Sequence, residues 1–147
     1  MQSSPKLFGR SPDNPDRRAP VKTVYNIVLG STSSNATTTW ADVAGSSVNH
    51  VFTRQRAMIW AHFGAVTSSG TQRAMGRICV GSAEGENESG VFGAAVERSV
   101  VLAEEFNVDF ATDDPVAVKL QHKSETNGPS AQVLNAVKIM FVIEEYD

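Results

Sequence analysis

A two-residue alternation of apolar side chains in two runs near the end of the chain is the feature that most constrains the fold. Val137, Ile139, Phe141 and Ile143 alternate with Lys138, Met140 and Val142, and Val116, Val118 and Leu120 repeat the pattern in residues 116–120. Side chains two positions apart lie on the same face of a strand. The alternation therefore predicts two half-buried strands, the second of which places Phe141 in the core.

Similar stretches recur along the chain. Strand-like segments occur within residues 21–29, 37–43, 48–53, 57–66, 73–80, 91–102, 105–110 and 131–134. Turn-forming residues separate them, as in residues 67–70 and 124–130. About eight to ten short strands without an amphipathic helix are typical of an all-β sandwich or barrel. Within this pattern, Trp40 is expected to be the buried anchor of the strand at residues 37–43.

Residues 57–66 best fit a central strand. One face carries Ala57, Ile59, Ala61, Phe63 and Ala65, and the other carries Met58, Trp60, His62 and Val66. Both faces are largely apolar, which predicts that the strand is covered on both sides, one of them by a neighbouring chain. A helix is the alternative, because the run is rich in alanine. Its aromatic and β-branched residues and the turn that follows favour a strand.

The first 20 residues differ in composition from the rest. They contain Pro5, Pro12, Pro15 and Pro20 together with many polar residues. Such a segment buries too little apolar surface to fold by itself. We therefore divide the chain into an extended N-terminal arm, residues 1–20, and a β-sandwich domain, residues 21–147. The arm is expected to dock on a neighbouring subunit through the apolar and basic side chains of Leu7, Phe8, Arg10, Arg17 and Arg18.

The composition argues against several classes of function. The formal net charge is −3, and no dense basic segment indicates nucleic-acid binding. No apolar run approaches the roughly 20 residues needed to span a bilayer, and no secretory signal is evident. Cys79 is the single cysteine, so no internal disulfide is expected. We expect synthesis in a reducing cytoplasm, with neither nucleic acid nor membrane as a partner.

No cluster of residues indicates catalysis. His50, His62 and His122 lack metal-ligand spacing with one another or with Cys79, and no nucleophile or phosphate-binding motif is evident. We therefore predict that the chain is not an enzyme and has no catalytic, cofactor-binding or metal-ligating residues.

Two acidic segments and four aromatic residues leave alternatives open. Glu84, Glu86 and Glu88 alternate in one segment, and Asp113 and Asp114 are adjacent in another. Carboxylates so placed could hold Ca²⁺, but the EF-hand order is missing and solvated acidic loops are the favoured interpretation. Trp40, Trp60, Tyr25 and Tyr146 could form a carbohydrate platform, although the alternating positions of the tryptophans favour core or interface.

Six segments occur in an order known from one family of β-sandwiches. Thr-Thr-Thr-Trp-Ala-Asp-Val-Ala-Gly at residues 37–45 precedes the alternating strand at 57–65, and Arg-Ile-Cys-Val follows at 77–80. Phe-Asn-Val-Asp-Phe comes at 106–110, Val-Ala-Val-Lys-Leu-Gln-His-Lys-Ser at 116–124, and Leu-Asn-Ala-Val-Lys-Ile-Met-Phe-Val-Ile at 134–143. This order resembles jelly-roll domains of the tumour-necrosis-factor and complement-globular-head type, especially those on bacteriophage virions.

The resemblance implies an antiparallel jelly-roll β-sandwich that assembles as a homotrimer. In such trimers, apolar faces of several strands, including those near the C-terminus, line the threefold axis. Trp60, Met140 and Val142 are apolar although they lie opposite the expected core positions. Apolar strips of this kind mark interfaces, so these three residues are the candidates for the trimer interface.

We therefore expect a non-enzymatic structural virion protein, either a trimeric capsid decoration (cement) protein or a head spike. The arm would dock it to the major capsid protein or another virion protein, and binding only the assembled shell would stabilise that shell by mass action. The alternative is a phage tail or fibre-tip module that binds a host surface glycan or protein. That module would carry aromatic residues in its distal loops, and residues 67–72, 81–90 and 124–130 contain none.

Overall fold

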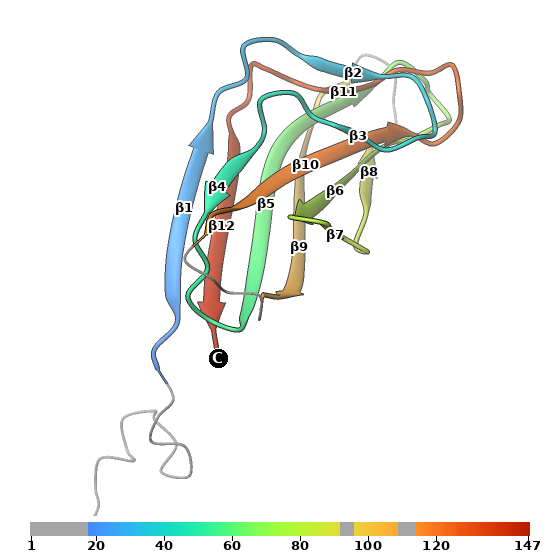
Figure 1. Cartoon of the computed structure of the whole chain (residues 1–147). Coiled ribbons are helices and arrows are strands. Elements are labelled where there is room, and N and C mark those ends of the chain that lie inside the picture. Colours follow the sequence, from blue (N-terminus) through green and yellow to red (C-terminus); the bar gives the residue numbers. More distant parts are fainter. Residues whose placement is uncertain (1–17, 92–95, 109–113) are drawn as a thin grey trace, which may run out of the picture.

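The computed structural model describes residues 18–91, 96–108 and 114–147, which form twelve β-strands and no helix (Figure 1). The strands are β1 (Val21–Ile27), β2 (Ser33–Asn35), β3 (Ala41–Asp42), β4 (Val48–His50), β5 (Arg56–Thr67), β6 (Ala74–Val80), β7 (Ala83–Glu84), β8 (Ser89–Val91), β9 (Arg98–Asn107), β10 (Val116–Ser124), β11 (Ala131–Val133) and β12 (Ile139–Tyr146). They build two antiparallel sheets that pack as a sandwich, which confirms the predicted fold class.

The first sheet, here called the β5 sheet, is organised around its longest strand. β12 and then β11 pair with one edge of β5, and β9 pairs with the other edge. β1 lies outside β12, and β2 lies outside β11. The run at residues 57–66 is therefore a central strand, as its two apolar faces predicted.

The second sheet, here called the β10 sheet, has β10 and β6 at its centre. β3 and β4 both pair with the same edge of β10, and β7 and β8 both pair with the far edge of β6. Between β3 and β4 the main-chain N–H of Val43 still donates to the carbonyl oxygen of Leu120 at 2.9 Å. β3 and β4 thus act as one interrupted strand.

The chain is wound as one long hairpin. Representative partners, taken inward from the ends, are Val21 with Glu145, His50 with Val116, Arg56 with Asn107 and Cys79 with Glu84. These pairs alternate between the β5 sheet and the β10 sheet as the chain proceeds. Wrapping a hairpin around a core in this way produces a jelly roll.

The core lies between the two sheets and is built from the inward side chains of each strand. Ile59 and Ala61 of β5 pair with Ile143 and Phe141 of β12, and all four are fully buried. Each large aliphatic or aromatic side chain buried in this way contributes about 1.5–3 kcal/mol. The prediction that Phe141 lies in the core is confirmed.

Of the strand predicted at residues 37–43, only Ala41–Asp42 (β3) forms. Residues 37–39 bend, and Trp40 is half-buried outside the hydrophobic core. The side chain of Asn35 is the cause, because its oxygen accepts from the main-chain N–H and hydroxyl of Thr37 while its amide donates to the carbonyls of Thr39 and His122. Such local side-chain bonds compete with a strand ladder.

Candidate interaction surface

The outer face of the β5 sheet carries a continuous apolar row. Strand pairing aligns Val24, Val142, Trp60 and Ala103 across β1, β12, β5 and β9. Val24 is 50% exposed, whereas Trp60 and Val142 are half-buried. Because neighbouring strands lie about 4.8 Å apart, these four side chains form a band across the whole sheet.

A second row lies beside the first. Strand pairing aligns Asn26, Met140, His62 and Val101 in the same strand order, and Val101 is 62% exposed. Monomeric proteins rarely leave large contiguous apolar patches in water. Together we call seven residues of these two rows the apolar face: Val24, Val142, Trp60, Ala103, Met140, His62 and Val101.

Charged side chains border the apolar face in the next row. That row aligns Lys22, Glu144, Met58 and Glu105. Lys22 lies at the β1 margin of the sheet and Glu105 at the β9 margin. Glu105 accepts a hydrogen bond from the hydroxyl of Tyr146.

The outer face of the β10 sheet is polar. Lys119 Nζ and Gln121 Nε2 donate to the Asp42 carboxylate at 3.0 and 2.9 Å. Arg77 donates from Nε and Nη2 to Gln121 Oε1 at 2.9 and 2.7 Å, and its Nη1 lies 3.4 Å from Glu84 Oε2. These side chains satisfy one another across the strands, which suits a face in contact with water. Of the two outer faces, the apolar face therefore has the composition of a protein interface.

Trp40 belongs to the polar face. Arg77 Cζ lies 4.4 Å and Lys123 Nζ 4.7 Å from the centroid of its ring, which are cation–π distances. The prediction that Trp40 is a buried strand anchor is wrong, because these two long side chains of the outer face cover its ring.

The structure brings the predicted trimer-interface residues together. Trp60 and Val142 are direct cross-strand partners, and Met140 lies in the adjoining row. Four other members of the apolar face were not among the residues predicted for the interface: Val24, Ala103, Val101 and His62. The alternation within residues 21–28 is the sequence signal that places Val24 on the outer face.

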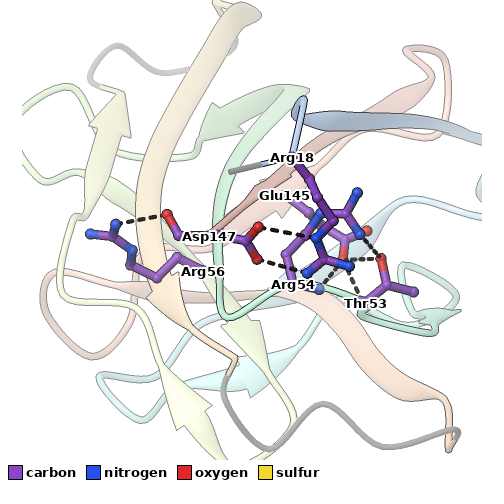
Figure 2. Close-up of polar contacts among 6 residues, drawn as sticks. All are labelled: Arg18, Thr53, Arg54, Arg56, Glu145 and Asp147. Carbon is purple, nitrogen blue, oxygen red and sulfur yellow. Dashed lines mark hydrogen bonds and ion pairs between the residues drawn. The ribbon is translucent and has the colours of Figure 1, made fainter. Parts of the chain in front are cut away.

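The predicted arm residues are mostly outside the described part of the chain. Leu7, Phe8, Arg10 and Arg17 lie there, and Arg18 is the first residue that the structure describes. Arg18 donates from Nε and Nη2 to the two carboxylate oxygens of Asp147 at 3.1 and 2.8 Å (Figure 2). These hydrogen bonds raise the pKa of Arg18 and lower that of Asp147. The arm therefore joins the domain beside the end of β12.

A buried polar network ties this end of the sandwich together. Glu145 is 2% exposed, and its carboxylate accepts the main-chain N–H groups of Thr53 and Arg54 at 2.6 and 3.3 Å (Figure 2). Its Oε2 lies 2.8 Å from His50 Nε2, and His50 Nδ1 lies 2.7 Å from the hydroxyl of Tyr25. Burial and the nearby Glu145 carboxylate raise the pKa of Tyr25. A carboxylate so satisfied can be buried, and the network links β1, β4 and β12.

A second buried histidine lies between the sheets. His122 is 2% exposed, with Nε2 at 3.1 Å from the hydroxyl of Ser33. Within the described residues its Nδ1 has no hydrogen-bond partner. Burial lowers the pKa of His122 to about 4, so the ring is neutral near pH 7.

The acidic segments do not converge on one point. Glu84 and Glu88 extend toward Arg77 and Lys123 on the polar face at 3.4 and 3.9 Å. Asp113 lies outside the described residues. No group of three or more potential metal ligands occurs in the part of the chain that the structure describes, and the same residues contain no helix long and apolar enough to cross a bilayer.

No protein-family model matches the sequence, and no curated protein matches it. Among solved structures, similar chains come from viral capsid proteins of infectious bursal disease virus. The structure of the Gx strain has 11% identity and a TM-score of 0.47, covering 87% of this chain and 36% of its own. The VP2 subviral particle has 11% identity and a TM-score of 0.47, covering 88% and 37%.

The chain thus spans little more than a third of the length of the viral chains it matches. Likeness at this identity and TM-score defines neither a family nor a role. We therefore infer function from the contrast between the two outer faces of the sandwich.

Proposed function

We propose that the chain is a non-enzymatic structural protein of a virion that assembles as a homotrimer through the apolar face. Residues 21–147 would be the jelly-roll domain, and residues 1–20 the arm that docks it to the particle. The single observation that carries this proposal is the contrast between the outer faces. Ion pairs and hydrogen bonds cover the β10 sheet, whereas Val24, Trp60 and Val142 continue across the β5 sheet without a charge among them.

Further copies of the same chain are the expected occupant of the apolar face. Lys22 lies at the β1 margin of this sheet and Glu105 at the β9 margin. A contact between the β1 margin of one copy and the β9 margin of the next brings these opposite charges together. Head-to-tail contacts of this kind form a ring when the rotation from one copy to the next closes, and the resemblance to tumour-necrosis-factor-type domains favours a ring of three.

The arm and the same resemblance support the placement on a virion. The segment 1–20 is rich in proline and lacks the apolar content to fold by itself. Arg18, bonded to Asp147, fixes where it leaves the domain. We propose that Leu7, Phe8 and the basic residues of the arm bind the major capsid protein or another virion protein, which would make the chain a capsid decoration (cement) or head spike protein of a bacteriophage.

A pair of matched variants tests the assembly. Met140 and Met75 are both half-buried and point outward from central strands, Met140 on the apolar face and Met75 beside Lys123 on the polar face. In sedimentation equilibrium the wild type and Met75→Asp should be trimers, and Met140→Asp should be a folded monomer. A monomeric wild type, or a trimeric Met140→Asp, would overturn assembly through this face.

Removal of residues 1–17 tests docking, because the Arg18–Asp147 ion pair is retained. The shortened chain should have the circular dichroism spectrum and trimeric mass of the full chain but should fail to bind particles that lack the protein. Binding equal to that of the full chain would refute the docking role of the arm. Binding of the trimer to host cells instead of particle heads would indicate the tail or fibre-tip module.

A further inference from the structure

We infer that His62 makes association through the apolar face sensitive to pH, so that the copies separate when this histidine gains a proton. This inference depends on the proposed assembly through that face. It adds a regulatory role for a residue that has no part in the core or in the buried polar network.

His62 lies within the apolar face. It points outward from β5, and its cross-strand neighbours are Met140 of β12 and Val101 of β9. The next outward residue of its own strand is Trp60. The ring is half-buried, and within the described chain no group forms a hydrogen bond with either of its nitrogens. In a single copy, water reaches the part of the ring that stays exposed.

Among the described residues, strand pairing places no carboxylate beside His62 to balance a positive charge. The acidic residues on the same side of the sheet, Glu144 of β12 and Glu105 of β9, both pair with Met58. Met58 is four residues from His62, or about 13 Å along the strand. On β1 the residue in the same row is Asn26. The lysines closest to this row are Lys22, four residues before Asn26 on β1, and Lys138, two residues before Met140.

Covering the apolar face with a second copy removes this water. A neutral imidazole tolerates the loss far better than an imidazolium, because burying an unpaired charge costs much more than burying a polar group. The separated chain therefore binds the proton more readily than the assembled chain does. By linkage, association weakens as the pH falls through the range in which histidine takes up a proton.

Sedimentation velocity of the full chain at pH 7.5 and pH 5.5 tests this inference. The association constant of the wild type should fall about tenfold for each histidine covered in the assembly. His62→Gln, which stays neutral, should associate equally at both pH values. His62→Lys, which stays charged, should be a monomer at both. Circular dichroism at each pH checks that the sandwich remains folded.

The outcomes separate this inference from the assembly on which it depends. A wild type that stays assembled at pH 5.5 would overturn the role of His62 and leave the trimer intact. An equal loss of association at pH 5.5 in the wild type and in His62→Gln would also overturn the role of His62, because another residue would then be responsible for the pH dependence. A wild type that is monomeric at pH 7.5 would overturn the assembly itself, and the inference with it.

Discussion

Trp60 on β5 and Val142 on β12 are direct cross-strand partners on the outside of the sandwich. An aromatic residue opposite a β-branched one stabilises a sheet by roughly 0.2–1 kcal/mol. Even as cross-strand partners, both side chains remain only half-buried. The pair therefore contributes to the stability of a single copy and still presents apolar area for a neighbour to cover.

The fluorescence of Trp60 should report assembly. In a Trp40→Phe variant Trp60 is the only tryptophan, and its emission should shift to longer wavelength when dilution separates the copies and exposes the ring. The matched Trp60→Phe variant retains Trp40 on the polar face, and its spectrum should not depend on concentration. An unchanged Trp40→Phe spectrum across the association range, located by sedimentation, would place Trp60 outside the contact.

Phe141→Asp should prevent folding. Phe141 is fully buried between the sheets. An unpaired carboxylate there costs several kcal/mol, which is comparable to the whole free energy of unfolding of a domain. Its neighbour Met140 points outward, so Met140→Asp should retain the β-sheet circular dichroism spectrum of the wild type. A soluble, folded Phe141→Asp chain would show that the inward and outward faces of β12 have been assigned incorrectly.

His122 should make the fold less stable in acid. Its pKa is about 4 in the folded chain and its ordinary value is 6.5, so between these values the unfolded chain binds more protons. The free energy of unfolding therefore falls as the pH is lowered from 6.5 to 4, by about 3 kcal/mol at most. Below the folded pKa the decrease is complete, because the ring is then protonated in both the folded and the unfolded chain.

Urea unfolding at pH 7 and pH 4.5 measures this effect. The loss of stability on acidification should be smaller in His122→Gln than in the wild type, whatever the absolute stability of the variant. Comparing the two losses removes the contribution of the carboxylates that both chains share. Equal losses would show that the neutral ring of His122 does not set the acid sensitivity.

Glu145→Ala should destabilise the domain strongly. It removes the acceptor for two main-chain N–H groups, those of Thr53 and Arg54, and the partner of His50. Leaving a buried donor without its acceptor typically costs about 1–3 kcal/mol, and several donors lose their acceptor here. The adjacent Glu144 lies on the outer face, and Glu144→Ala should change stability by roughly 0.5 kcal/mol or less. Urea unfolding at pH 7 compares the two, and similar values would contradict a structural role for the network.

Long alternating strands were predictable from the sequence, whereas short ones were not. β5 and β12 repeat the two-residue period often enough to separate an inward from an outward face. β2, β3 and β7 have two or three residues each, too few for a period to appear. Neighbours in space, not their own sequence, determine that these residues pair. The bend before Trp40 likewise depends on Asn35, whose side chain reaches His122 in a distant strand.

The candidate surface was partly predictable for the same reason. Trp60, Met140 and Val142 follow from alternation within single strands, but the alignment of Trp60 with Val142 depends on strand register. The buried network shows the limit most clearly. Glu145 continues the inward positions of β12, yet its partner His50 lies 95 residues away. A sequence pattern within one strand contains no information about such a partner.

The hairpin winding has a consequence for synthesis. β1 pairs with β12, so β1 has no partner until β12 has been synthesised. The β5 sheet therefore cannot be completed while β12 is missing, and domains generally fold as units. Copies that stop before β12 would leave β1 unpaired, together with residues 56–62 on one edge of β5. The winding therefore acts as a check on completeness, because only copies that include β12 can form the surface that we propose for assembly.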